Sequence, residues 1–163
     1  MAIVDIKELR AAVPRGKRLL GLDLGSKTIG LAICDSNFAV ASPLKTIQRS
    51  KFTHDANALE SLIKYREIGG LILGLPRNMD NSEGPRAQST RQFAANLLGQ
   101  FDIPITFWDE RLSTVSVERM LIDQADLSRR KRAKVVDKLA ASIILQGALN
   151  LMATQREAAS DIE

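Results

Sequence analysis

The order of apolar segments predicts an α/β domain with a five-stranded mixed sheet and helices on both of its faces. Two apolar segments joined by the small-residue turn Gly25-Ser26-Lys27-Thr28 predict an antiparallel hairpin. Leu71–Leu75 contains no polar residue, which is typical of a strand buried on both faces. Alternating strands and helices would also fit an all-parallel, flavodoxin-like sheet, but the antiparallel start argues against it.

Each expected element follows from a local signal. Pro14-Arg15-Gly16 ends a first short helix, Pro43 favours an edge position for the third strand, and Gly69-Gly70 ends the second helix. Ser82 is expected to cap the third helix, and Ser113 or Thr114 the fourth. The expected elements are a helix in Ile3–Val13, strands in Arg18–Leu24, Ile29–Cys34 and Val40–Ile47, a helix in Phe52–Arg66, a strand in Leu71–Leu75, a helix ending near Leu98, a strand in Ile103–Trp108, a helix ending near Ile122 and a last helix in Lys134–Met152.

Length and composition fit one domain of 163 residues that is 45% hydrophobic and 26% charged. Residues 1–17 are expected to be an N-terminal extension, and residues 153–163 a mobile tail. The apolar runs are too short to cross a bilayer, and the N-terminus lacks the features of a secretory signal, so we expect a cytoplasmic protein with no membrane partner. Cys34 and His54 are each the only residue of their type, which argues against a zinc site and a histidine-based triad.

The formal charge of +4 is mild, but the basic residues gather just before the last helix. The run Arg129, Arg130, Lys131, Arg132 and Lys134 is expected to be a loop that either grips a nucleic acid or is merely solvated.

Three acidic positions are unusual. Asp23 lies in an otherwise apolar strand, where a carboxylate is costly unless it is paired or bound to a cation, although it could also begin the turn. Asp109 and Glu110 follow a strand directly, and only one of them can face Asp23, which the spacing alone does not decide. Asp137 either caps the last helix or points inward, because it is in line with Ala141 and other apolar residues at helical spacing.

The negative charges of these carboxylates would repel one another unless a divalent cation bound there. Mg²⁺ and Mn²⁺ prefer hard oxygen ligands, so either ion is the expected cofactor. Two ions about 3.5–4 Å apart can activate a water and stabilise the leaving oxygen in phosphodiester hydrolysis. The acidic positions therefore suggest a metal-dependent nuclease.

Four segments of the chain resemble the YqgF/RuvX family of pre-16S ribosomal RNA nucleases, which is related to Holliday junction resolvases of the RuvC type. They are GLDLGSKTIGLAICD (Gly21–Asp35), LILGLPRNMDNSEGPRAQSTRQFAANL (Leu71–Leu97), ITFWDERLSTVSVERML (Ile105–Leu121) and KVVDKLAASIILQGALN (Lys134–Asn150). The resemblance implies a ribonuclease H-like fold and a catalytic, metal-binding triad of Asp23, Glu110 and Asp137. It favours Glu110 over Asp109, which remains a candidate supporting residue.

Basic side chains near these motifs are candidates for substrate binding. Lys27, Arg77, Arg86 and Arg111 are included together with Arg129, Arg130, Lys131 and Arg132. The alternative for each is an ordinary surface charge, and for Arg111 a local pair with an acid. Phe107 and Trp108 could stack on a base or belong to the core.

The resemblance leaves the substrate open. The expected partner is precursor ribosomal RNA, including RNA within ribosomal precursor particles, and the expected activity is 5′-end processing of pre-16S rRNA. Branched DNA is the alternative substrate. A junction resolvase would act as a homodimer, whereas a trimming nuclease could act as a monomer. Two further alternatives are a non-catalytic assembly factor and an ATP-binding protein of the actin, Hsp70 and sugar-kinase class, because Asp23-Leu24-Gly25 resembles the first phosphate loop of that class.

Overall fold

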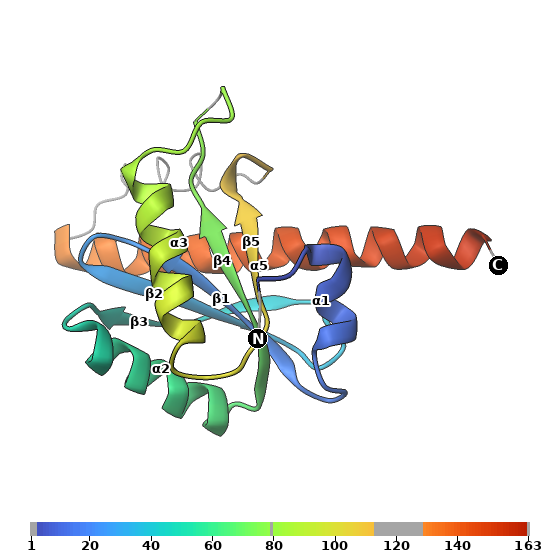
Figure 1. The fold of residues 1–163 in the computed structure, drawn as a ribbon, viewed down its shortest axis with the longest axis horizontal. Helices are drawn as coiled ribbons and strands as arrows, with labels where there is room; N and C mark the ends of the chain where they lie inside the picture. The colour runs from blue at the N-terminus through green and yellow to red at the C-terminus, as the bar shows by residue number, and fades with distance from the viewer. Residues whose placement is uncertain (1–2, 79, 113–128, 163) are drawn as a thin grey trace.

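The molecule is built on a five-stranded mixed sheet with the strand order β3-β2-β1-β4-β5 (Figure 1). The structure, a computed structural model, describes residues 3–78, 80–112 and 129–162, and within the last range the side chains of residues 136–158. Antiparallel pairing joins β1, β2 and β3, whereas β4 and β5 run parallel to β1. The strands are β1 (Arg18–Leu24), β2 (Thr28–Cys34), β3 (Ala41–Gln48), β4 (Ile68–Leu75) and β5 (Ile105–Asp109).

Helices cover both faces of this sheet, which confirms the predicted architecture. The helix α5 packs with α1 on one face, and α2 and α3 pack on the other (Figure 1). A 3₁₀ turn, η1, directly follows β5. The helical elements are α1 (Ile6–Ala12), α2 (Phe52–Tyr65), α3 (Pro85–Leu98), η1 (Glu110–Leu112) and α5 (Arg129–Ile162).

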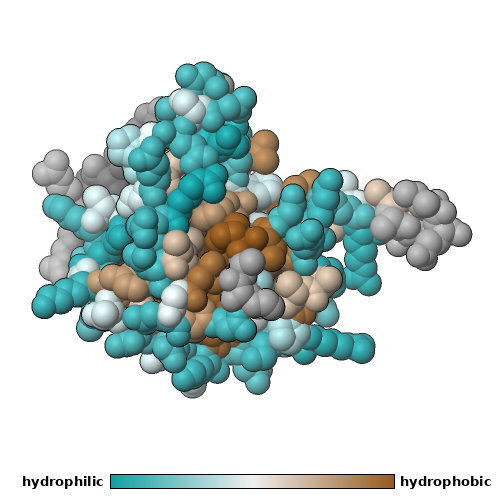
Figure 2. Space-filling view, viewed as in Figure 1, coloured by the Kyte–Doolittle hydropathy of each residue, from teal (hydrophilic) through white to brown (hydrophobic). Residues whose placement is uncertain are grey.

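The alternation of side chains along β1 divides the core into two layers. Leu19 belongs to the layer under α5, whereas Leu20 and Leu22 belong to the layer under α2 and α3, and all three are fully buried. Leu59 and Leu97 face the sheet from α2 and α3, while the outer side of these helices is mostly hydrophilic (Figure 2). Burying each such side chain contributes roughly 1.5–3 kcal/mol, so the helices are held mainly by their apolar faces.

The last helix differs from the prediction at both ends. The segment from Arg129 to Lys134 was expected to be a loop, but α5 already begins at Arg129. Arg, Lys and Ala are strong helix formers, and no Gly or Pro interrupts the chain before Gly147, which explains the earlier start. At the other end, the helix continues through the expected tail to Ile162 rather than ending near Met152.

The start of α3 also differs from the prediction. Gly84 occupies the N-cap position, and Pro85 is the first helical residue, where its fixed φ and missing N–H suit a helix start. Ser82 bonds instead to Asp80 through its backbone N–H and its hydroxyl, so it shapes the preceding loop and does not cap the helix. The helix expected from Ser113 or Thr114 to Ile122 lies outside the described residues.

Residues 136–158 of α5 are long and apolar enough, by length and composition, to cross a membrane. The central helix of a folded domain satisfies the same criterion. Here one side of the helix is buried against the sheet, since Ala141, Ile144, Leu145 and Ala148 have no solvent exposure. We therefore describe α5 as the core helix of the domain.

Candidate active site

Asp23 lies near the carboxyl end of β1, on the face of the sheet that α5 covers. A Cβ atom added to Gly21 would lie 3.0 Å from the carbonyl oxygen of Ala141, so Gly21 faces α5. Asp23 follows two residues later and therefore faces the same way. Only 1% of Asp23 is exposed to solvent, although it is a charged residue in an apolar strand. Its exceptional burial, predicted from the sequence as one of two alternatives, makes it the centre of the site.

Two glycines flank Asp23 on the neighbouring strands. Gly30 is its partner on β2. On the other side Leu22 pairs with Leu73, so the next residue of the parallel strand, Gly74, lies beside Asp23. Because neither neighbour has a side chain, space is left on both sides of the carboxylate, and groups from other elements fill it.

Asp137 fills the space above Gly30. A Cβ atom on Gly30 would lie only 2.1 Å from the backbone oxygen of Asp137, so α5 contacts the strand here without an intervening side chain. The Thr28 hydroxyl donates a hydrogen bond to Asp137 Oδ2. Asp137 therefore points toward the hairpin of β1 and β2, which confirms the inward alternative and leaves its carboxylate at the sheet.

Glu110 and Ile144 of α5 together fill the space above Gly74. A Cβ atom on Gly74 would lie 2.8 Å from Glu110 Oε1. Glu110 begins η1 two residues after Trp108, whose ring packs against Gly147 of α5. The structure thus places Glu110 on the Asp23 side, in agreement with the family pattern. Trp108 is 5% exposed and belongs to the core, so the structure does not support a base-stacking role for it.

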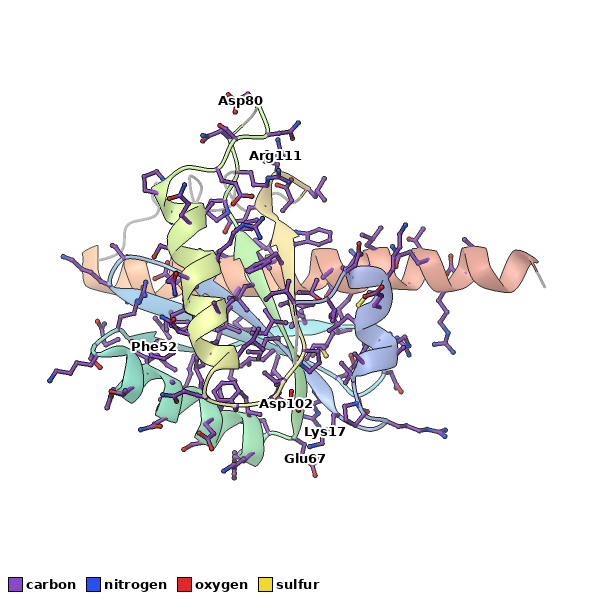
Figure 3. All side chains as sticks on the ribbon, in the orientation of Figure 1. Lys17, Phe52, Glu67, Asp80, Asp102 and Arg111 are labelled. Carbon is purple, nitrogen blue, oxygen red and sulfur yellow. The ribbon has the colours of Figure 1, made fainter. Side chains whose placement is uncertain are left out.

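Asp109 points away from this cluster and pairs with Arg111. The Arg111 Nη2 atom lies 2.6 Å from Asp109 Oδ2, and Nε lies 3.0 Å from Oδ1. These hydrogen bonds from Arg111 hold the pKa of Asp109 below its ordinary value of 3.8. Arg111 also donates to the carbonyl of Asn78 and to the side chain of Asn81, so it ties the end of β5 to the loop after β4, close to Asp80 (Figure 3).

Arg77 belongs to the same network. Its Nη2 atom donates to the carbonyl of Asn81 at 3.1 Å, and its guanidinium lies 3.8 Å from Glu83 and 4.0 Å from Asp109. Arg77 and Arg111, both predicted to contact substrate, are therefore paired with acids in this structure. Their predicted contact with phosphates stays a prediction.

A cleft of about 850 Å³ opens on the other side of Asp23. It is bounded by the turn between β1 and β2, the residue after β3, the first turns of α3 and Asp137. Lys27 and Arg86 line it, as expected of substrate-binding residues, and Arg86 lies 3.9 Å from Asp23. Arg49 lines it too and was missed by the sequence analysis, because its place depends on the long-range pairing of β2 with β3.

The predicted basic residues Arg129, Arg130, Lys131 and Arg132 form the first turn of α5, just before Asp137. Their side chains lie outside the described part of the structure. The backbone places this turn on the same helix as Asp137. Their role in substrate binding stays a prediction.

Carboxylate oxygens are the donors that Mg²⁺ and Mn²⁺ prefer, and three elements bring Asp23, Glu110 and Asp137 to one edge of the sheet. In donor chemistry the cluster therefore fits a hard divalent cation. The conformation described here does not close such a site. Among the described residues, no group of three His, Cys, Asp or Glu side chains has the spacing that holds a metal ion. Asp137 Oδ2 instead accepts the hydrogen bond from Thr28.

The sheet order and this acidic edge define an α/β protein of the ribonuclease H-like class. Two solved structures share the fold at low sequence identity. The RuvC resolvase of Thermus thermophilus, solved with a Holliday junction, has a TM-score of 0.53 and 9% identity over 85% of this chain and 97% of RuvC. The yeast mitochondrial Holliday junction resolvase Ydc2 has a TM-score of 0.52 and 13% identity over 93% and 86% of the two chains.

This chain belongs to the RuvX family, as its sequence motifs predicted. The family model, described as Holliday junction resolvase, matches residues 17–151. A relative from Roseobacter denitrificans is 56% identical over 92% of this chain and 93% of its own length. Another from Ruegeria sp. (strain TM1040) is 59% identical over 90% and 92% of the two chains. Both are provisionally named pre-16S rRNA nucleases.

Proposed function

We propose that this protein is a nuclease that hydrolyses phosphodiester bonds in precursor ribosomal RNA, in 5′-end processing of the pre-16S molecule. The observation that carries the proposal is the convergence of Asp23, Glu110 and Asp137 over two glycines at one edge of the sheet. The names of the relatives support RNA as the substrate, since they are nearly as long as this chain and more than half identical to it. The proposal includes a cytoplasmic location and action on ribosomal precursor particles.

The proposed cofactor is Mg²⁺ or Mn²⁺, held by Asp23, Glu110 and Asp137. Such a cation, held by these three carboxylates, would supply water activation at neutral pH and would stabilise negative charge on the leaving oxygen. The protein contributes the rest. Asp23 is fixed by its strand, Glu110 by the turn that Arg111 anchors, and Asp137 by Thr28 and the packing of α5. Lys27 and Arg86 then attract the substrate phosphates to this edge.

Replacing Asp23 with Asn tests the proposal. The change keeps the shape of the side chain but removes its charge, so we expect cleavage of labelled precursor rRNA in Mg²⁺ or Mn²⁺ to fall by more than about 100-fold. Binding of the same RNA should remain or become tighter, because repulsion between carboxylate and phosphate is reduced. Asp102→Asn is the matched control, since Asp102 is exposed just before β5, at the opposite end of that strand (Figure 3). Unchanged cleavage by Asp23→Asn would refute the proposal.

Junction cleavage is the second candidate, favoured by the description of the matching family model. A four-way DNA junction in the same assay separates the two. Paired symmetric nicks, made by a dimer, would move the function to DNA recombination. Binding of RNA without cleavage in any metal would identify an assembly factor, and tight binding of ATP would identify a nucleotide-binding protein.

A further inference from the structure

The cleft beside Asp137 is lined by three basic side chains from three different elements. Lys27 lies on the turn after β1, Arg49 directly follows β3, and Arg86 is in the first turn of α3. Lys27 is exposed and Arg86 is half exposed, so both can reach a ligand in the cleft. In the part of the chain that the structure describes, neither Lys27 nor Arg49 forms an ion pair with an acidic residue. Their positive charges are therefore available to a ligand.

Arg49 is held in place on three sides. Its Nη1 atom donates to the carbonyl of Gly25 at 2.7 Å, and its backbone N–H donates to the carbonyl of Lys27 at 2.8 Å. Its guanidinium carbon lies 5.6 Å from the centre of the Phe93 ring. An arginine has five N–H donors, so further donors remain for a ligand after the bond to Gly25. A side chain fixed in this way loses little entropy when it binds a phosphate.

Charges are arranged differently on the β5 side of the catalytic edge, the sheet edge that carries Asp23, Glu110 and Asp137. There the arginines are paired with acids: Arg91 Nε lies 2.6 Å from Glu83, and Arg111 Nη2 lies 2.6 Å from Asp109. Arg77 lies between these two acids. Among the described side chains, Lys27 and Arg49 thus place positive charge without an acidic partner on the β3 side of Asp23. Arg86 lies 3.9 Å from Asp23, and the arginines on the β5 side are neutralised by Glu83 and Asp109.

We propose that the RNA strand leaves the catalytic edge on the β3 side through this cleft, and that Arg49 binds one of its phosphates. The inference rests on the proposed function, because it takes the ligand to be RNA. It adds a substrate-binding residue and a direction. The strand is held on one side of the scissile bond by Lys27, Arg49 and Arg86, and it is not gripped by the paired arginines near Asp109.

The salt dependence of RNA binding tests this inference. For a single strand, the slope of log K against log salt changes by about 0.7 for each phosphate contact. Binding of a labelled single-stranded RNA would be measured by fluorescence anisotropy between about 50 and 200 mM salt, in the Asp23→Asn background so that the RNA stays intact. We expect Arg49→Met to make the slope shallower by about 0.7, and the double variant with Lys27→Met by about 1.4.

Three matched variants separate charge from structure. Arg66→Met removes an exposed arginine that also lies over an aromatic ring, at the far end of α2, and should leave the slope unchanged. Arg91→Met removes a paired arginine on the other side and should also leave it unchanged. Arg49→Lys keeps the charge and should keep the parental slope.

An unchanged slope in Arg49→Met would overturn the inference, and so would equal losses in Arg49→Lys and Arg49→Met, because the second result would indicate a purely structural role. A loss in Arg91→Met as large as that in Arg49→Met would overturn the direction. If the unsubstituted protein cleaves RNA in these cases, the proposed function stands. If the unsubstituted protein neither binds nor cleaves RNA, both fail.

Discussion

Substituting Gly30 with Ala should damage the active site from a position that carries no functional group. The added Cβ atom would lie 2.1 Å from the backbone oxygen of Asp137 and 2.3 Å from its carbonyl carbon. Ordinary contacts begin near 3.4 Å, so the start of α5 must move by about 1.3 Å, and backbone atoms cannot rotate out of the way as a side chain can. That movement would carry Asp137 away from Asp23.

We expect two measurable effects of Gly30→Ala. Overpacking of this kind costs about 1–3 kcal/mol, which lowers the melting temperature of a chain of this size by about 2–12 °C. A shift of about 1 Å in a catalytic group costs on the order of 100-fold in rate. Thermal unfolding followed by circular dichroism, together with cleavage of labelled precursor rRNA, measures both effects.

The matched control for Gly30→Ala is Gly99→Ala. Gly99 follows α3 with a right-handed helical conformation, and the nearest atom to an added Cβ is 3.3 Å away. Alanine in such a conformation is neutral or stabilising by about 0.4–1 kcal/mol. If Gly30→Ala and Gly99→Ala both melt and cleave like the parent, the idea that Gly30 lacks a side chain to make room for Asp137 is refuted.

Three further predictions concern the other parts of the site and the fold. Gly74→Ala should push aside both Ile144, whose Cδ1 atom is nearest to the added Cβ, and the Glu110 carboxylate, whose Oε1 atom lies 2.8 Å from it. Cleavage should fall, and the melting temperature should drop less than in Gly30→Ala, because side chains rather than backbone must move. Arg111→Lys should lower the turnover number by roughly 100-fold with little change in KM, because a lysine cannot make the forked contacts that anchor the turn. A turnover number equal to that of the parent in steady-state assays would contradict this. Asp35→Asn should destabilise the fold at neutral pH only. The backbone N–H of Val40 holds the pKa of Asp35 below its ordinary value. The contribution of Asp35 to the free energy of unfolding is therefore present above about pH 4 and is lost as the pH falls through the lowered pKa. Urea unfolding at pH 7 and pH 3 should therefore show a difference between parent and variant that shrinks in acid, and a constant difference would contradict the assignment.

The sequence predicted the sheet well because each strand carries its own local signal. The hairpin across Gly25–Thr28 and the apolar run of β4 depend on residues close together in the chain. The predicted start of α5 was wrong. A run of basic residues suggested a loop, but Arg and Lys are good helix formers when no Gly or Pro interrupts them. The prediction that Ser82 caps α3 was also wrong, because Gly84 occupies the N-cap position and Pro85 begins the helix.

The acids of the site could be predicted in part. Asp23 and Asp137 stood out because each is a charge in line with apolar residues. Periodicity left two alternatives open for each, and the structure shows that Asp23 is buried and that Asp137 faces the hairpin. The choice between Asp109 and Glu110 depends on which residue shares a face with Trp108, and this in turn depends on where β5 ends and η1 begins. Arg49 could not be found from local spacing, because only the pairing of β3 with β2 brings it to the cleft.

The placement of Asp137 on α5 also sets the order in which the three proposed catalytic carboxylates are made during synthesis. Asp23 lies on β1 and Glu110 begins η1 directly after β5, and both elements precede α5 in the chain. A nascent chain emerging from the ribosome therefore exposes two of the three carboxylates before the third has been made. The catalytic cluster is completed only when α5 packs over Gly21, Gly30 and Gly74 and buries Ile144 and Leu145. Folding of the core and assembly of the proposed catalytic cluster are thus one event, and under the proposed function we expect a chain that ends before α5 not to cleave RNA.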